Sequence, residues 1–145
     1  MNNALKTILS TNASLSSLPL RLGLGIVMVA HGAQKLFGAF GGYGLQGTAG
    51  FFENSLGMKP GILWAALASG TEFSGGLLLI IGLATRPAAA LIGLTMLVAL
   101  ITVHSGGFFA PNGVEYTLIL TLASISLAIK GGGSLSLDRR LVPVK

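Results

Sequence analysis

The hydrophobic residues of this chain are gathered into long runs, with most polar residues between them. Four runs lie at about residues 20–40, 62–83, 87–104 and 114–129, near the roughly 20 residues that a helix needs to cross a bilayer. The fourth is the shortest, and we expect the glycines at 131–133 to end it. The pattern predicts an all-α integral membrane bundle of four transmembrane helices.

The amino-acid composition also indicates a protein that lies partly in lipid. Of its 145 residues, 52% are apolar and 9% are charged, against roughly 25% charged in an ordinary soluble domain. The nine basic residues flank the apolar runs, so membrane orientation explains the net charge better than nucleic-acid binding. The absence of cysteine excludes disulfides and thiolate chemistry within the chain. We expect a lipid bilayer, and no nucleic acid, as partner.

The basic residues also predict an orientation. Four spans place both termini and the loop around Arg86 on one side of the membrane. That side carries seven basic residues, against Lys35 and Lys59 on the other, and the positive-inside rule then makes it cytoplasmic. Residues 1–18 form an N-terminal cytoplasmic tail without a cleavable signal pattern. Residues 19–142 form one transmembrane domain of the bacterial inner membrane.

The aromatic residues are distributed in the opposite way. Nine of the ten belong to the outer ends of the spans or to the outer loops, and only Phe73 lies within the membrane. Two interpretations remain open: the outer loops lie among lipid headgroups, or they line a pocket that opens outward. Residues 48–56 are typical of a short interfacial helix, which would carry Phe51 and Phe52.

Small residues form a stripe along the second span. Ala66, Gly70 and Ser74 recur every four residues, as do Thr71 and Gly75. Residues at this spacing share one helix face, and small side chains let membrane helices approach closely. We therefore expect the stripe to pack against a neighbour.

The predicted topology brings several polar residues to a similar depth in the outer half of the membrane. His31 and Lys35 share one face of the first span, while Glu72 lies near the middle of the second. An ionisable residue inside a membrane is costly and is by default a functional candidate. We predict a hydrogen bond between Glu72 and His31, direct or through water. The candidates for ligand binding or proton transfer are His31, Lys35, Glu72, His104 and Glu115.

Three of these candidates also have ordinary structural interpretations. Lys35 can snorkel to the outer interface, Glu115 can be an acidic residue favoured near a helix N-terminus, and His104 can bind a backbone partner at a helix end. No pair has a compact metal-ligand spacing, so we predict no metal site. Gly42, Gly44 and Gly47 match a dinucleotide-binding pattern. They follow a membrane helix instead of a strand, which excludes that fold.

Four segments together carry a resemblance to a known family. They read RLGLGIVMVAHGAQKLFGAFGG, GTAGFFENSLGM, TEFSGGLLLIIGLATRPAA and HSGGFFAPNGVEYTLIL followed by SLDRRL. In order and spacing they are similar to the DoxX family of small bacterial four-helix membrane proteins, over about residues 18–142. The resemblance implies a four-helix transmembrane bundle linked to membrane oxidoreductases. The family name derives from a thiosulfate:quinone oxidoreductase subunit, and relatives are associated with superoxide-detoxifying and sulfur-transferring partners.

The leading functional expectation is a membrane subunit of a redox system, with an outward pocket for a quinone or another small amphipathic molecule. One alternative is a non-catalytic scaffold that docks soluble redox enzymes through its basic cytoplasmic face, supported by the C-terminal segment SLDRRLVPVK. The other is a small transporter or proton pathway. Whether the chain itself is a catalytic oxidoreductase stays open at this point. The identity of the cofactor and formation of a homo-oligomer stay open as well.

Overall fold

The described part of the computed structural model, residues 3–11 and 14–142, is built from helices and contains no strand. The four longest helices are α2 (Ser17–Phe37), α4 (Gly61–Ile81), α5 (Thr85–Thr102) and α6 (Glu115–Lys130). Shorter elements are α1 (Asn3–Leu9), the 3-10 helix η1 (Ala39–Gly41), α3 (Gly44–Asn54) and α7 (Leu137–Leu141). The all-α fold class is confirmed, and each long helix lies within a few residues of an expected span.

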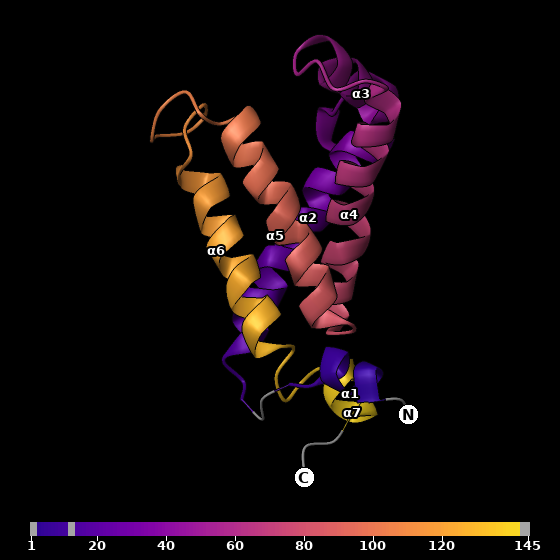
Figure 1. Cartoon of the computed structure of the whole chain (residues 1–145), viewed down its shortest axis with the longest axis vertical. Helices are drawn as coiled ribbons and strands as arrows, with labels where there is room; N and C mark the ends of the chain where they lie inside the picture. Colours follow the sequence, from indigo (N-terminus) through magenta and orange to yellow (C-terminus); the bar gives the residue numbers. More distant parts are fainter. Residues whose placement is uncertain (1–2, 12–13, 143–145) are drawn as a thin grey trace.

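The four long helices form two pairs that diverge toward one end (Figure 1). Helix α2 packs along α4, and α5 packs along α6. At the wider end lie α3 and the loop between α5 and α6, and at the narrower end lie α1 and α7 (Figure 1). We call these the α3 end and the α7 end.

Glycine lets α2 and α4 approach until their backbones touch. A Cβ atom added at Gly76 would lie 2.8 Å from the carbonyl oxygen of Gly25, and one added at Gly32 would lie 2.5 Å from the backbone nitrogen of Phe73. Neither position has room for a side chain. The expected role of small residues in helix packing is confirmed at these positions.

The stripe at Ala66, Gly70 and Ser74 does not behave as expected. Ala66 and Ser74 are exposed, and a Cβ atom at Gly70 would meet no atom within 4 Å. The expectation that this stripe packs against a neighbour is wrong for the described chain. The expectation holds at Gly75, where an added Cβ atom would lie 3.1 Å from the side chain of Ile92 in α5.

Two of the long helices, α4 and α5, are each long and apolar enough to cross a membrane unaided. Helix α2 meets this test together with η1 and α3, across a bend of 91°. Helix α6 has 16 residues, fewer than the roughly 20 expected for a span. Large apolar side chains are exposed along the outer faces, including Ile101 (61%), Ile119 (65%) and Ile129 (67%). A surface of this kind is suited to lipid.

The α7 end is closed by buried charged groups. Asp138 is 1% exposed, and its carboxylate accepts hydrogen bonds from the backbone N–H groups of Ala84 (2.7 Å) and Thr85 (2.9 Å). This caps the first turn of α5. Arg21 is 2% exposed and donates to the carbonyls of Gly132 (2.6 Å) and Leu135 (2.8 Å). Arg21 therefore holds the fold together, in addition to the orienting role expected from its charge.

Candidate functional site

A cavity of about 480 Å³ lies between the diverging helix pairs toward the α3 end. One wall is the α3-side half of α4 and the other is the α3-side half of α5, while α3 with its following loop and the last turns of α2 complete the lining. Most of the lining is apolar. Its residues are His31, Lys35, Thr48, Phe51, Phe52, Leu56, Met58, Trp64, Leu67, Ala68, Thr71, Glu72, Leu91, Leu94, Thr95, Val98, Ala99, Thr102, Val103 and His104.

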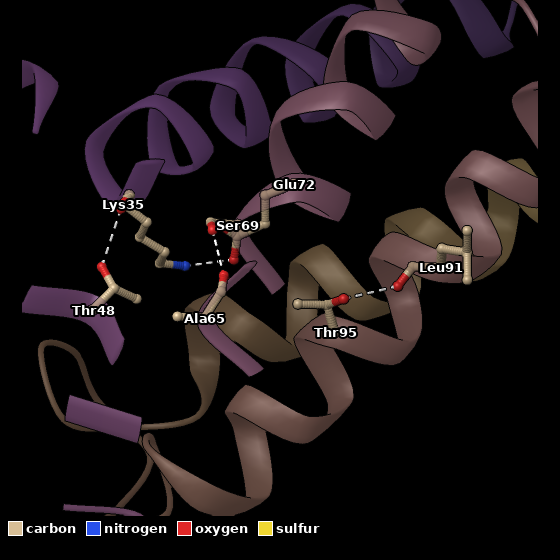
Figure 2. A network of polar contacts seen from close by, with 7 residues as sticks. All are labelled: Lys35, Thr48, Ala65, Ser69, Glu72, Leu91 and Thr95. Carbon is tan, nitrogen blue, oxygen red and sulfur yellow. Dashed lines mark hydrogen bonds and ion pairs between the residues drawn. The ribbon is translucent and has the colours of Figure 1, made fainter. Parts of the chain in front are cut away.

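An ion pair between α2 and α4 provides the polar centre of this cavity. The Lys35 ammonium lies 2.5 Å from Oε1 of Glu72, and the two side chains point toward each other (Figure 2). Glu72 is 1% exposed, whereas Lys35 is 33% exposed. An isolated carboxylate at such a depth would be very costly, so a cation beside it compensates for the lost solvation. Lys35 thus turns inward to a partner, in contrast to the snorkelling interpretation.

The second carboxylate oxygen of Glu72 is unused. Oε2 is buried and has no hydrogen-bond partner among the described residues. A buried polar atom without a partner is uncommon in proteins and calls for an explanation. Because Glu72 lines the cavity, a ligand in this cavity could supply the missing donor.

The two histidines approach the cavity from different elements. His31 lies on α2 and His104 follows the end of α5, and both line the cavity. The ring of His31 lies 6.3 Å from the ring of Tyr116, tilted by 47°. The structure gives Glu72 a direct bond to Lys35 and none to His31. The direct form of the predicted Glu72–His31 hydrogen bond is therefore replaced by the ion pair.

The fifth candidate, Glu115, lies outside the cavity lining. Its Oε1 accepts a hydrogen bond of 2.8 Å from the backbone N–H of Ala110, which ties the loop between α5 and α6 to the start of α6. The structure thus brings His31, Lys35, Glu72 and His104 to one cavity and leaves Glu115 in a loop contact. Within the described residues, no group of three or more His, Asp or Glu side chains is placed to hold a metal ion.

Hydroxyl groups of the cavity were not anticipated from the sequence. Thr95 and Thr102 are seven residues apart, so they share one face of α5, and both line the cavity. Their hydroxyls donate to the carbonyls of Leu91 (3.0 Å) and Val98 (2.7 Å) in their own helix (Figure 2 shows the first of these). Their oxygens remain able to accept a hydrogen bond. The spacing of seven in an apolar helix was the signal that could have identified them.

The helix α3 that covers the cavity is anchored beside the ion pair. The Thr48 hydroxyl lies within hydrogen-bond distance of the carbonyls of Lys35 (3.2 Å) and Gly44 (2.8 Å), and it reaches from α3 to the residue that pairs with Glu72 (Figure 2). This helix extends over Gly44–Asn54, and the short helix expected at 48–56 is confirmed.

Some of the aromatic residues line the cavity and others are exposed, so both interpretations from the sequence, a pocket lining and contact with lipid headgroups, apply to different residues. Phe51, Phe52 and Trp64 line the cavity, whereas Phe40 and Tyr43 are 80% and 88% exposed. The first group supplies apolar walls, and the second is placed for contact with an interface.

Comparison with known proteins agrees with this membrane fold. The chain is 36% identical to "Putative oxidoreductase CatD" of Bacillus subtilis over 124 residues, which cover 86% of this chain and 85% of that protein. It is 31% identical to "Inner membrane protein YphA" of Escherichia coli over 127 residues, 83% of this chain and 86% of that protein. An uncharacterized membrane protein of Mycobacterium tuberculosis is 32% identical over 134 residues, 84% and 78% of the two chains.

No solved structure matches the chain. The chain is a multi-pass membrane protein, and the inner-membrane localisation expected from its sequence agrees with the names of these relatives. A profile of the DoxX family matches residues 16–105, well over half of the sequence. This protein belongs to the DoxX family.

Proposed function

We propose that this protein is a membrane component of a redox system and that its cavity binds a quinone or a similar small amphipathic molecule. Support for the redox class comes from the relative named an oxidoreductase. Support for the ligand class comes from the cavity, which combines apolar walls with a few convergent polar groups. Such a combination is typical of sites for small organic ligands.

The single observation that carries the proposal is the free oxygen of Glu72. A carboxylate that forms an ion pair with the Lys35 ammonium can only accept hydrogen bonds. Its unpartnered Oε2 therefore favours a ligand that brings a donor, such as the hydroxyl of a reduced quinone. Lys35 offers donors to a carbonyl oxygen. A head group whose ring carries an oxygen atom at each end can bind both residues. One oxygen accepts a hydrogen bond from Lys35, and the hydroxyl at the other end donates one to Oε2 of Glu72.

The histidines extend the chemistry available at this head group. A neutral imidazole can accept a proton, and the imidazolium so formed can return it; His31 and His104 both line the cavity. A bound quinol would supply the electron-donating chemistry and would become the quinone as it gives up two electrons and two protons. The contribution of this chain would be to orient the ring, exclude water and hold a proton at an imidazole nitrogen or at Glu72.

The proposal includes a topology. All four long helices cross the inner membrane, both termini lie in the cytoplasm, and the α3 end faces outward. The cavity then lies in the outer half of the bilayer between α4 and α5. Its apolar, lipid-facing lining at Leu91 and Leu94, which are 56% and 59% exposed, gives a membrane-soluble ligand a route of entry.

The test is a binding measurement on purified protein in lipid nanodiscs, with a short-tailed ubiquinol and menadiol as probes. Glu72→Gln should raise the Kd about tenfold or more, because a hydrogen bond to a charged group contributes roughly 1.5–3 kcal/mol. The matched control is Glu115→Gln, a carboxylate outside the cavity, which should change the Kd by less than about twofold. Absence of binding to the wild type, or equal Kd values for the two variants, would contradict the proposal.

The scaffold alternative rested on the basic segment SLDRRLVPVK. In the described part of that segment, Asp138 is 1% exposed and Arg139 donates its backbone N–H to the Ser136 hydroxyl, while residues 143–145 lie outside the described residues. Asp138 thus anchors this segment to the fold, whereas Arg140 is exposed. Docking of soluble redox enzymes on this basic face is kept as the alternative function if no ligand binds.

A further inference from the structure

The segment between α5 and α6, residues 103–114, is largely exposed but contains no lysine, arginine, aspartate or glutamate. We call it the α5–α6 loop. Phe108 and Phe109 are 56% and 78% exposed, and their rings meet edge to face with 5.2 Å between the centroids. An uncharged loop that exposes two large aromatic side chains is unfavourable in water and suited to a lipid interface.

The α5–α6 loop satisfies several of its polar backbone groups internally. The backbone N–H of Val114 donates to the carbonyl of Gly107 at 3.0 Å. The backbone N–H of Glu115 donates to the carbonyl of Phe108 at 3.0 Å, and its Oε1 accepts the bond from Ala110 described above. Each of these bonds pairs groups that would be costly to leave unpaired in lipid.

The lengths of the helices place this loop at a different depth from α3. Helix α6 has 16 residues and α4 has 21, which at about 1.5 Å per residue gives lengths of about 24 Å and about 31 Å. The hydrocarbon core of a bilayer is about 30 Å thick. Helix α4 is therefore long enough to cross the core, whereas α6 is shorter than the core by about 6 Å.

The missing length of α6 lies at the α3 end. At the α7 end, Arg86 in the first turn of α5 donates to the carbonyl of Ala128 in the last turn of α6 at 3.3 Å, so these two helix ends lie at a similar level. The α5–α6 loop must then return from the end of α5 to the lower start of α6. It stays nearer the α7 end than α3 does (Figure 1).

We propose that the α5–α6 loop inserts into the outer leaflet of the bilayer, with Phe108 and Phe109 at the boundary between headgroups and acyl chains. This rests on the topology given under the proposed function, in which α6 crosses the membrane and the α3 end faces outward. The loop fills the depth that α6 does not reach, while Phe40 and Tyr43 lie further out. Because the loop has no charged residue, its insertion requires no charged lipid.

The test uses the absence of cysteine from the chain, which makes a single introduced thiol the only site of labelling. Phe109→Cys and Tyr43→Cys are compared in phosphatidylcholine nanodiscs, because the native side chains are similarly exposed, 78% and 88%. A charged, membrane-impermeant thiol reagent should react at least about tenfold more slowly at residue 109, since charge is excluded from the apolar region. Each rate is divided by the rate for the same variant unfolded in detergent.

A bimane dye attached to the same thiols reports their depth. At residue 109, lipids brominated on their acyl chains should quench the fluorescence more than aqueous iodide does, and at residue 43 the order should be reversed. Phe108→Cys should behave like Phe109→Cys, and it replaces that variant if the latter fails to fold.

Equal labelling rates, or stronger quenching by iodide at the loop thiols, would overturn the insertion of the loop. Slow labelling without quenching by brominated lipid would also overturn it, because a second copy or another protein would then cover the loop. Ile119→Cys on α6, where the native side chain is 65% exposed, distinguishes this failure from a failure of the topology. Quenching by brominated lipid at residue 119 alone would leave the topology intact, whereas quenching by iodide at residues 119 and 109 would overturn both.

Discussion

The two ends of the molecule both bury charged side chains, but they satisfy them differently. At the α7 end, both oxygens of Asp138 accept hydrogen bonds from backbone N–H groups. The terminal nitrogens of Arg21 donate to backbone carbonyls, while its buried Nε has no partner among the described residues. At the α3 end, Glu72 has a single partner, Lys35, and one oxygen remains free. A buried carboxylate whose oxygens are all occupied is explained by the fold, whereas one with a free oxygen beside a cavity is a candidate for ligand binding.

The largest expected effect follows from removing the α7-end carboxylate. Asp138→Ala leaves the backbone N–H groups of Ala84 and Thr85 without acceptors and the Arg21 charge without its nearby anion. We expect a loss of about 3–5 kcal/mol in the free energy of unfolding, measured by denaturant unfolding in mixed micelles. Arg140→Ala, an exposed neighbour, should change stability by less than about 0.5 kcal/mol.

A folded Asp138→Ala protein should still bind the quinol, because its cavity lies at the opposite end. Loss of binding at a temperature where the variant is folded would contradict the separation of the two regions. Unchanged stability would show that the α7 end does not depend on this carboxylate.

A smaller effect is expected at the α3-end ion pair. Lys35→Met leaves the buried Glu72 carboxylate without its cation, and we expect a loss of about 1–3 kcal/mol in stability. The double variant Lys35→Met with Glu72→Gln should recover part of this loss, because removing both charges costs less than leaving one unpaired. Denaturant unfolding of the four proteins gives the coupling energy. Strictly additive losses would contradict an ion pair in the folded protein.

The positions of the helices could be predicted from the sequence because they depend on residues that are close together in the chain. Lipid requires long apolar segments with internally satisfied backbone, so hydropathy located each of the four long helices to within a few residues. Glycine then ends α2 and α4, where Gly38 (φ 72°) and Gly82 (φ 70°) adopt the left-handed conformation. Boundaries of this kind depend only on neighbouring residues.

The contacts between distant residues could not be predicted in the same way. Lys35 and Glu72 are 37 positions apart in the sequence. Counting helical turns places Lys35 nearer the membrane interface than Glu72, because the count does not include the length of the lysine side chain. Asp138 caps a helix that begins 53 positions earlier. The stripe at Gly70 and Ser74 has the same sequence pattern whether it faces a helix or a groove. Pairing of this kind depends on packing that a single sequence does not encode locally.

The most direct test of the ligand site is photo-crosslinking with a quinone that carries a photoreactive group on its ring, followed by mass spectrometry of the labelled peptides. The account predicts adducts on the cavity segments 64–72 and 98–104, lost when unlabelled quinol is added in excess. Adducts confined to exposed residues of α6 such as Ile119 and Leu122, and insensitive to that competitor, would contradict it.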